Sequence, residues 1–246
     1  MKLKNILSTI MTDGIIIKSS GSSGPPKSYY QPTGKIFAAN KVAREVQGIT
    51  QNSKIYTVMK LSHAGGLFGQ TVPALEVGAY VYTDQFNAYE WVKKINNFTH
   101  SHITPLHAKA IMMTKRFWEL DLKGVTITCG AEPVTWDIIE AFVPRGCKFI
   151  VNWGMSEIGP IAINHIFETM EEVQRVKNMC PKGATVMGSN KYCEYQINNG
   201  ELVVRGDICI YDDWYHTKDA VIELDNILFY TGRTNKEVDF NNPTKG

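Results

Sequence analysis

The chain of 246 residues is long enough for one large domain or two small ones, and its 43% hydrophobic and 20% charged residues are typical of a globular protein. A formal net charge of +2 gives no indication of binding to nucleic acid or to a membrane surface, and no apolar run is long enough to span a bilayer. The 5 cysteines are scattered without C-x-x-C spacing, which argues against a disulfide framework or a zinc site. We therefore expect a cytoplasmic protein with no nucleic-acid partner and no membrane span.

Periodic apolar positions predict alternating strands and helices over residues 1–170. Strands are expected at 14–17, 54–60, 79–83, 125–129 and 148–152. Helices are expected at 35–49, between 66 and 78, around 91–95, at 105–117 and after 133. Such alternation predicts a layered α/β body with a largely parallel sheet, in which ligands bind at the carboxyl ends of strands. The segments that follow strands, at 19–27, 130–133 and 153–157, are therefore expected to converge on one cleft.

The pattern changes from about residue 180, where short strand-like runs follow one another. These runs lie at 200–205, 208–211, 220–224 and 227–230. Asp225 and Asn226 form a two-residue hairpin signal between the last two, so a small antiparallel sheet is expected. The charged stretch 168–177 is expected to form a connecting helix. We therefore predict an α/β body over residues 1–170 and a β-rich subdomain over residues 180–246.

Residues 19–27 combine serine hydroxyls, glycines and a lysine directly after the apolar run 14–17, which predicts a buried strand. Glycines allow close backbone approach, successive N–H groups form an anion-binding concavity, and the lysine adds a full positive charge. This composition is typical of a phosphate-binding loop. The structural alternative is a flexible Gly/Ser linker, which Pro25 and Pro26 argue against. A Walker loop is excluded because Pro26 stands where that motif has a glycine before Lys27.

The same stretch resembles the phosphate loop of adenylate-forming enzymes, the superfamily of acyl-CoA synthetases, luciferases and peptide-synthetase adenylation domains. The family pattern is two hydroxyl residues, glycine, two hydroxyl residues, glycine, any residue, proline and lysine, and every position of 19–27 fits it. The resemblance implies nucleotide binding by Ser19, Ser20, Gly21, Ser22, Ser23, Gly24 and Lys27.

Six further segments resemble motifs of this family and follow in the family's order. They are LSHAGG at 61–66, CGAEP at 129–133, NWGMSE at 152–157, GELVVRG at 200–206, WYHTKD at 214–219 and YTGRTN at 230–235. The resemblance implies that the 129–133 segment runs along an adenine, that Trp153 packs on the base and that Glu157 holds Mg²⁺. It also implies that Asp219 grips the ribose hydroxyls and that His63 lies near the acyl pocket. The implied nucleotide-binding set therefore also includes Gly130, Ala131, Glu132, Pro133, Asn152, Trp153, Gly154, Met155, Ser156, Asp219 and Arg233, with catalytic roles for Lys27, His63 and Glu157.

The resemblance implies a protein that binds ATP or AMP with Mg²⁺ and converts a carboxylic acid to an acyl-adenylate, with coenzyme A or a carrier thiol as acceptor. Lys218 and Asn235 depart from the family pattern, which has glycine and aspartate there. The chain has about half the usual family length, and we expect it to lack the mobile C-terminal domain with its catalytic lysine. A separate lysine-bearing domain in trans and a second copy of the chain are therefore expected partners. The alternative function is a nucleotide-binding or interaction module that has lost turnover.

Several of these residues also have a purely structural interpretation. His63 would be a core histidine hydrogen-bonded to the backbone, and Glu157 would be an ordinary surface carboxylate. The histidines of the 100–107 stretch suggest a metal site, but no carboxylate or cysteine stands at ligand spacing, so no metal is expected there.

Overall fold

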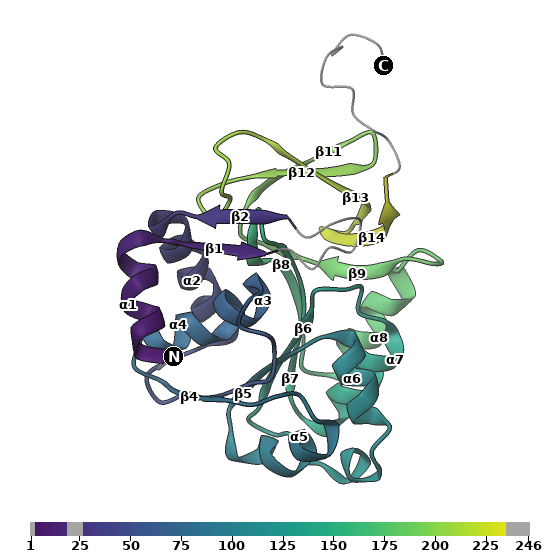
Figure 1. The fold of residues 1–246 in the computed structure, drawn as a ribbon. Coiled ribbons are helices and arrows are strands. Elements are labelled where there is room, and N and C mark those ends of the chain that lie inside the picture. Colours follow the sequence, from purple (N-terminus) through teal and green to yellow (C-terminus); the bar gives the residue numbers. More distant parts are fainter. Residues whose placement is uncertain (1–2, 19–26, 235–246) are drawn as a thin grey trace.

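The computed structural model describes residues 3–18 and 27–234. Lys27 lies within these ranges, whereas the other predicted loop residues lie outside them, namely Ser19, Ser20, Gly21, Ser22, Ser23 and Gly24. The fold is α/β, as predicted. A seven-stranded, mostly parallel sheet carries helices on both faces, and a separate five-stranded antiparallel sheet lies at one end of it (Figure 1).

The central sheet has the strand order β10-β8-β7-β6-β5-β3-β4. Its strands are β3 (Lys54–Thr57), β4 (Tyr80–Thr83), β5 (His100–Ile103), β6 (Thr126–Gly130), β7 (Lys148–Met155), β8 (Gly159–Phe167) and β10 (Asn190–Lys191). The strands from β4 through β7 run parallel, while β8 and β10 pair antiparallel. Every residue of β6 is buried, as expected for a parallel strand that is covered on both faces.

Helices cover both faces of this sheet (Figure 1). They are α1 (Leu3–Asp13), α2 (Thr33–Gln47), α3 (Ala64–Gly66), α4 (Val72–Glu76), α5 (Ala88–Lys94), α6 (Pro105–Met112), α7 (Trp136–Phe142) and α8 (Met170–Met179). Helix α2 packs Ala43 and Val46 against Ile150 and Ile161 on one face, and α5 to α8 build the largest core on the other. Within the described ranges, every helix is too short or too polar to pass through a bilayer.

The predicted strand at 14–17 is present as β1 (Ile15–Lys18), but it does not belong to the central sheet. It pairs antiparallel with β2 (Ser28–Gln31), and only Ile17 of its four residues is buried. The uninterrupted apolar run therefore predicted the strand correctly and its burial wrongly. A two-stranded hairpin can cover one face only, so alternate side chains remain exposed.

The antiparallel sheet has the strand order β11-β12-β13-β14-β9. Its strands are β9 (Thr185–Gly188), β11 (Glu194–Asn198), β12 (Glu201–Arg205), β13 (Tyr215–Leu224) and β14 (Ile227–Arg233). Asp225 and Asn226 form the predicted tight turn, with φ values of 48° and 61°. The strand predicted at 208–211 is wrong, because these residues form turns and bends. Ile208 and Cys209 are buried there, which explains the strand-like apolar pattern.

Sequence patterning did not predict β5, whose residues His100, Ser101 and His102 are polar yet buried. Each is hydrogen-bonded: His100 Nε2 to Gln47 O at 3.0 Å, the Ser101 hydroxyl to Tyr56 O at 3.0 Å, and His102 Nδ1 to Gly65 O at 3.1 Å. These bonds compensate burial of polar side chains. In the part of the chain that the structure describes, no three His, Cys, Asp or Glu side chains gather as a metal site would require.

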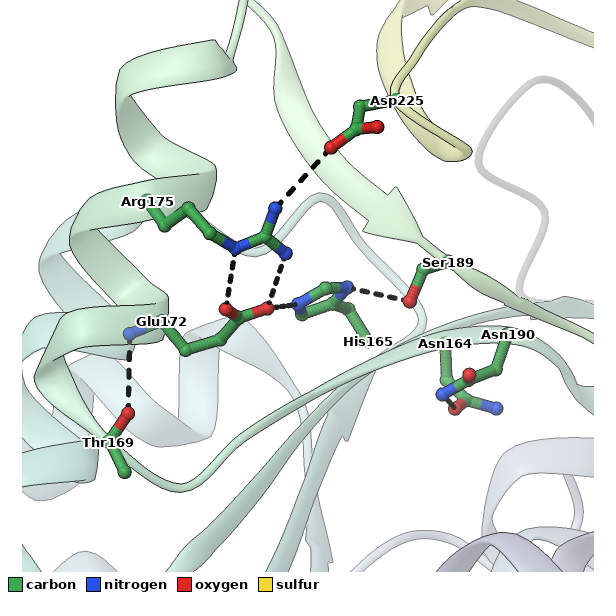
Figure 2. Close-up of polar contacts among 8 residues, drawn as sticks. All are labelled: Asn164, His165, Thr169, Glu172, Arg175, Ser189, Asn190 and Asp225. Carbon is green, nitrogen blue, oxygen red and sulfur yellow. Dashed lines mark hydrogen bonds and ion pairs between the residues drawn. The ribbon is translucent and has the colours of Figure 1, made fainter.

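A polar relay joins the two sheets through α8 (Figure 2). His165 on β8 contacts Glu172 Oε1 at 2.9 Å, and Ser189 Oγ lies 3.0 Å from His165 Nδ1. Arg175 binds both Glu172 oxygens, at 2.8 and 2.9 Å, and reaches Asp225 in the β13–β14 turn at 3.6 Å. Burial lowers the pKa of His165, and the hydrogen bond from Arg175 lowers the pKa of Glu172. A neutral His165 can therefore donate to the carboxylate while Ser189 donates to its other nitrogen.

Glu172→Ala should lower the free energy of unfolding by about 1–3 kcal/mol, because buried His165 loses its acceptor and Arg175 loses its bidentate partner. Urea denaturation at neutral pH measures this change. The matched control is Glu171→Ala, which removes an exposed carboxylate from the same helical turn. Equal losses in the two variants would contradict a stabilising role for the relay.

Candidate functional site

The carboxyl ends of β6 and β7 form one wall of the candidate site. Gly130 pairs with Asn152 across these strands, and a Cβ atom on Gly130 would lie 2.3 Å from Asn152 O. Only glycine allows this approach. Asn152 is buried and donates from Nδ2 to Pro160 O at 2.7 Å. The two predicted residues therefore shape the strand ends.

The exposed turn that follows β6 contains Ala131, Glu132 and Pro133. Ala131 adopts a φ of 74°, a left-handed conformation that costs energy in any residue with a side chain. The 130–133 segment is thus an open edge beside the end of β7.

Trp153, Asp219 and Arg233 are far apart in sequence and meet in the structure. The indole Nε1 of Trp153 donates to Asp219 Oδ2 at 2.8 Å, and Arg233 Nη1 donates to Asp219 Oδ1 at 2.5 Å. Asp219 is 5% exposed, whereas Trp153 is half-buried. An ionised carboxylate has about four acceptor positions, so these two bonds leave two for a ligand diol.

The backbone before Asp219 is irregular at a position where the chain departs from the family pattern. Lys218 has a φ of 62° at the position where the family pattern has glycine. Its N–H donates to Glu201 Oε1 at 2.9 Å, and the Thr217 hydroxyl donates to Leu202 O at 2.7 Å. These bonds to β12 hold the irregular backbone that directs Asp219 inward, opposite to exposed Lys218.

Gly154 and Met155 continue β7, so the turn predicted at 153–157 begins later than expected. A Cβ atom on Gly154 would lie 2.4 Å from Pro160 O, which makes this position another close backbone approach. Met155 packs against the core beneath the antiparallel sheet. Ser156 then begins the turn, and its carbonyl accepts a hydrogen bond from Gln31 Nε2 at 2.9 Å.

Glu157 is 7% exposed and lies where three elements meet. The Tyr215 hydroxyl of β13 donates to Glu157 Oε1 at 3.1 Å, and Ile210 N donates to Glu157 O at 2.9 Å. Tyr29 of β2 lies near the same carboxylate. Burial, followed by the neighbouring Glu157, raises the pKa of both tyrosines, so both hydroxyls remain protonated donors. The surface-carboxylate interpretation of Glu157 is therefore wrong.

Sequence reasoning missed Tyr29, Tyr215 and Gln31. A signal for two of them was available, because Tyr29 and Gln31 alternate on one side of a strand that directly follows Lys27. Their partners, 125 or more positions away, were not visible.

The β1–β2 hairpin places the ends of the predicted phosphate loop beside this site. Lys18 pairs with Ser28, and His63 Nδ1 lies 3.1 Å from Lys18 O. Because a carbonyl only accepts, Nδ1 of His63 is the donor. Lys27 is exposed at the start of β2. His63 therefore lies at the base of the loop, partly exposed and bonded to backbone.

The donor set fits a magnesium ion shared with nucleotide phosphates. Glu157 is a buried carboxylate that accepts from the neutral Tyr215 hydroxyl, and the described residues form no salt bridge with it. Mg²⁺ is usually held by one or two carboxylates together with substrate phosphates and water. A cation at Glu157 would therefore compensate a charge that its tyrosine partners leave uncompensated.

Comparison with known proteins shows which proteins this chain resembles. Among curated proteins, the indoleacetate–CoA ligase of Aromatoleum aromaticum is 25% identical over 229 residues, which cover 89% of this chain and 44% of the relative. The O-succinylbenzoate–CoA synthetase of Bacillus subtilis with AMP matches at 17% identity and a TM-score of 0.73, covering 91% and 50% of the two chains. The same enzyme with ATP and magnesium gives 18% and 0.72, with coverage of 90% and 50%.

The chain therefore spans about half the length of the relatives it matches, and at these identities the solved structures establish the fold alone. The sequence model of the family described as AMP-binding enzyme matches residues 15–211. This match covers most of the chain and contains the phosphate-loop stretch, the 129–133 segment and Glu157. The chain belongs to the AMP-binding enzyme family.

Proposed function

We propose that this chain binds ATP with magnesium and joins a carboxylic acid to the adenylate, as an acyl-adenylate-forming ligase. The observation that carries the proposal is the convergence of the Trp153–Asp219–Arg233 cluster and buried Glu157 beside the open 130–133 edge. These groups supply an aromatic face, a diol acceptor, a permanent cation and a carboxylate.

Each group has a task that its chemistry supports. The half-buried indole of Trp153 would offer its face to the base, and the 130–133 turn would lie along the edge of the base. Asp219 accepts from the two ribose hydroxyls with the positions that Trp153 and Arg233 leave open. Arg233, always charged, orients Asp219 and donates to ribose or phosphate oxygens.

In the reaction, a carboxylate oxygen of the acid attacks the α-phosphorus, and the bond to pyrophosphate breaks with its electron pair. Lys27 and the loop that precedes it would offset phosphate charge, and Glu157 would hold magnesium, which supplies charge neutralisation there. His63, at the base of the loop, would face the acid. Coenzyme A or a carrier thiol would then accept the acyl group, as the names of the relatives suggest.

Glu157→Gln should weaken MgATP binding by about tenfold or more and leave AMP binding nearly unchanged, because the metal bridges phosphates that AMP lacks. Isothermal titration with each nucleotide measures both effects. Glu171→Gln is the control for loss of one exposed negative charge. Equal losses for ATP and AMP would reject the metal role. ATP–pyrophosphate exchange with a panel of acids, including aryl-acetic acids, tests turnover itself.

A further inference from the structure

Glu157 lies beside two tyrosines that have no role in the proposed function. The Tyr215 hydroxyl of β13 donates to Glu157 Oε1 at 3.1 Å, Tyr29 of β2 lies near the same carboxylate, and Glu157 is 7% exposed. Tyr215 stacks on Tyr211 at 5.4 Å with an interplanar angle of 8°, which restricts its ring. The carboxylate is thus held by the hydroxyl of one stacked tyrosine, with a second tyrosine beside it.

Neutral donors orient a carboxylate without neutralising it. An ionised carboxylate has about four acceptor positions, so two phenolic donors leave two free for a cation. Groups that hydrogen-bond a metal ligand fix its direction, and losing one typically costs about 10- to 100-fold in metal affinity. Glu157 with its two tyrosines has the arrangement of a ligand and its supporting shell.

We propose that Tyr29 and Tyr215 are positioning residues that direct the Glu157 carboxylate toward the divalent cation of the bound nucleotide. This inference rests on the proposed function, since it assigns roles around the same metal. In this role both tyrosines act through Glu157.

The position of Tyr29 links the cation to the phosphate loop. It lies two residues after Lys27, and its strand is fixed to the same turn a second time, by Gln31 Nε2 donating to Ser156 O at 2.9 Å. Strand β2 is also paired with β1, so the two ends of the loop are held at one place. Orientation of Glu157 and placement of Lys27 are therefore coupled through one short strand.

Magnesium titration of ATP binding tests the positioning role. Tyr29→Phe and Tyr215→Phe should each weaken the apparent magnesium affinity at saturating ATP by about tenfold, while AMP affinity stays within about twofold of wild type. The matched control is Tyr30→Phe on the same strand, whose exposed hydroxyl donates to Asp13 O at 3.1 Å instead. It should change neither value. Unchanged magnesium affinity in both test variants would overturn the positioning role.

A second measurement needs neither metal nor nucleotide. The unfolding constant in urea is measured for Tyr29→Phe, Glu157→Gln and the double variant. The fold-change in the double variant should differ from the product of the two single fold-changes by about threefold or more. For Tyr30→Phe combined with Glu157→Gln, the fold-change in the double variant should equal the product of the two single fold-changes. Simple multiplication in the Tyr29 cycle would overturn the contact and the inference with it. If wild type failed to bind ATP while the Tyr29 cycle still showed coupling, the proposed function and the positioning role would fall, and the contact alone would stand.

Discussion

Asp219→Ala should weaken ATP and AMP binding alike, by about 10- to 100-fold, and should also lower stability by about 1–3 kcal/mol. The nucleotide loses its ribose acceptor, the Trp153 indole N–H loses its partner at 2.8 Å, and Arg233 loses its partner at 2.5 Å. Arg233 is 44% exposed, so water screens part of its loss and the lower end of the range applies to that bond. Isothermal titration and urea denaturation measure the two effects.

Two further variants separate these contributions. Trp153→Phe keeps an aromatic face but removes the indole N–H, so it should cost less affinity than Asp219→Ala. Asp212→Ala is the control, because this carboxylate is 96% exposed and pairs only with Lys35 at 3.3 Å among the described residues. If Asp219→Ala weakened ATP but not AMP, Asp219 would act on the phosphates and not on the ribose. Binding of 2′-deoxy-ATP as tight as that of ATP would lead to the same conclusion.

Gly154→Ala should destabilise the protein by about 1–3 kcal/mol or more, since the added methyl group would meet the Pro160 carbonyl at 2.4 Å and Gly159 O at 2.5 Å. These are backbone atoms of the first two residues of β8, so a rotamer change cannot relieve the contact. The strand ends would have to separate, and nucleotide affinity should fall with stability. Thermal denaturation with and without AMP measures both.

Gly34→Ala is the matched control for Gly154→Ala. Gly34 lies in the first turn of α2 with no heavy atom within 4 Å of the added Cβ. Alanine there should raise stability by a few tenths to about 1 kcal/mol, because it restricts the unfolded chain and favours helix. The two substitutions are chemically identical and should have opposite signs. A neutral Gly154→Ala would show that β7 and β8 tolerate a wider spacing than the structure has.

Much of the fold was predictable because its signals are local. Apolar periodicity identified α2 and β6, the charged stretch 168–177 identified α8, and the Asp225–Asn226 pair identified the β13–β14 turn. The misses arise where tertiary contacts override composition. Strand β5 is polar because its side chains bond to neighbouring backbone, and 208–211 is apolar because it packs under the antiparallel sheet. Local pattern cannot distinguish these environments.

The candidate site was predictable where motif residues themselves make the contacts. Trp153, Asp219 and Arg233 meet as a cluster, and Glu157 is buried in the turn that follows β7. The tyrosines beside Glu157 could not be found from the sequence. One lies on β2 and the other on β13, and they come close to Glu157 only in the folded chain. The roles of the individual site residues in nucleotide binding stay predictions.

The short strand β10 affects how the protein should unfold under mechanical force. Its two residues extend the central sheet, while Lys191 Nζ binds Asn226 O at 2.6 Å and Asn226 Oδ1 at 2.7 Å in the tip of the antiparallel hairpin. The side chain of Lys191 is only 9% exposed. Separating the two sheets would remove three acceptors from the nearly buried ammonium group of Lys191. They are Asn226 O, Asn226 Oδ1 and Glu223 Oε1. These contacts of Lys191 therefore resist separation of the two sheets, and both sheets should unfold in one cooperative step.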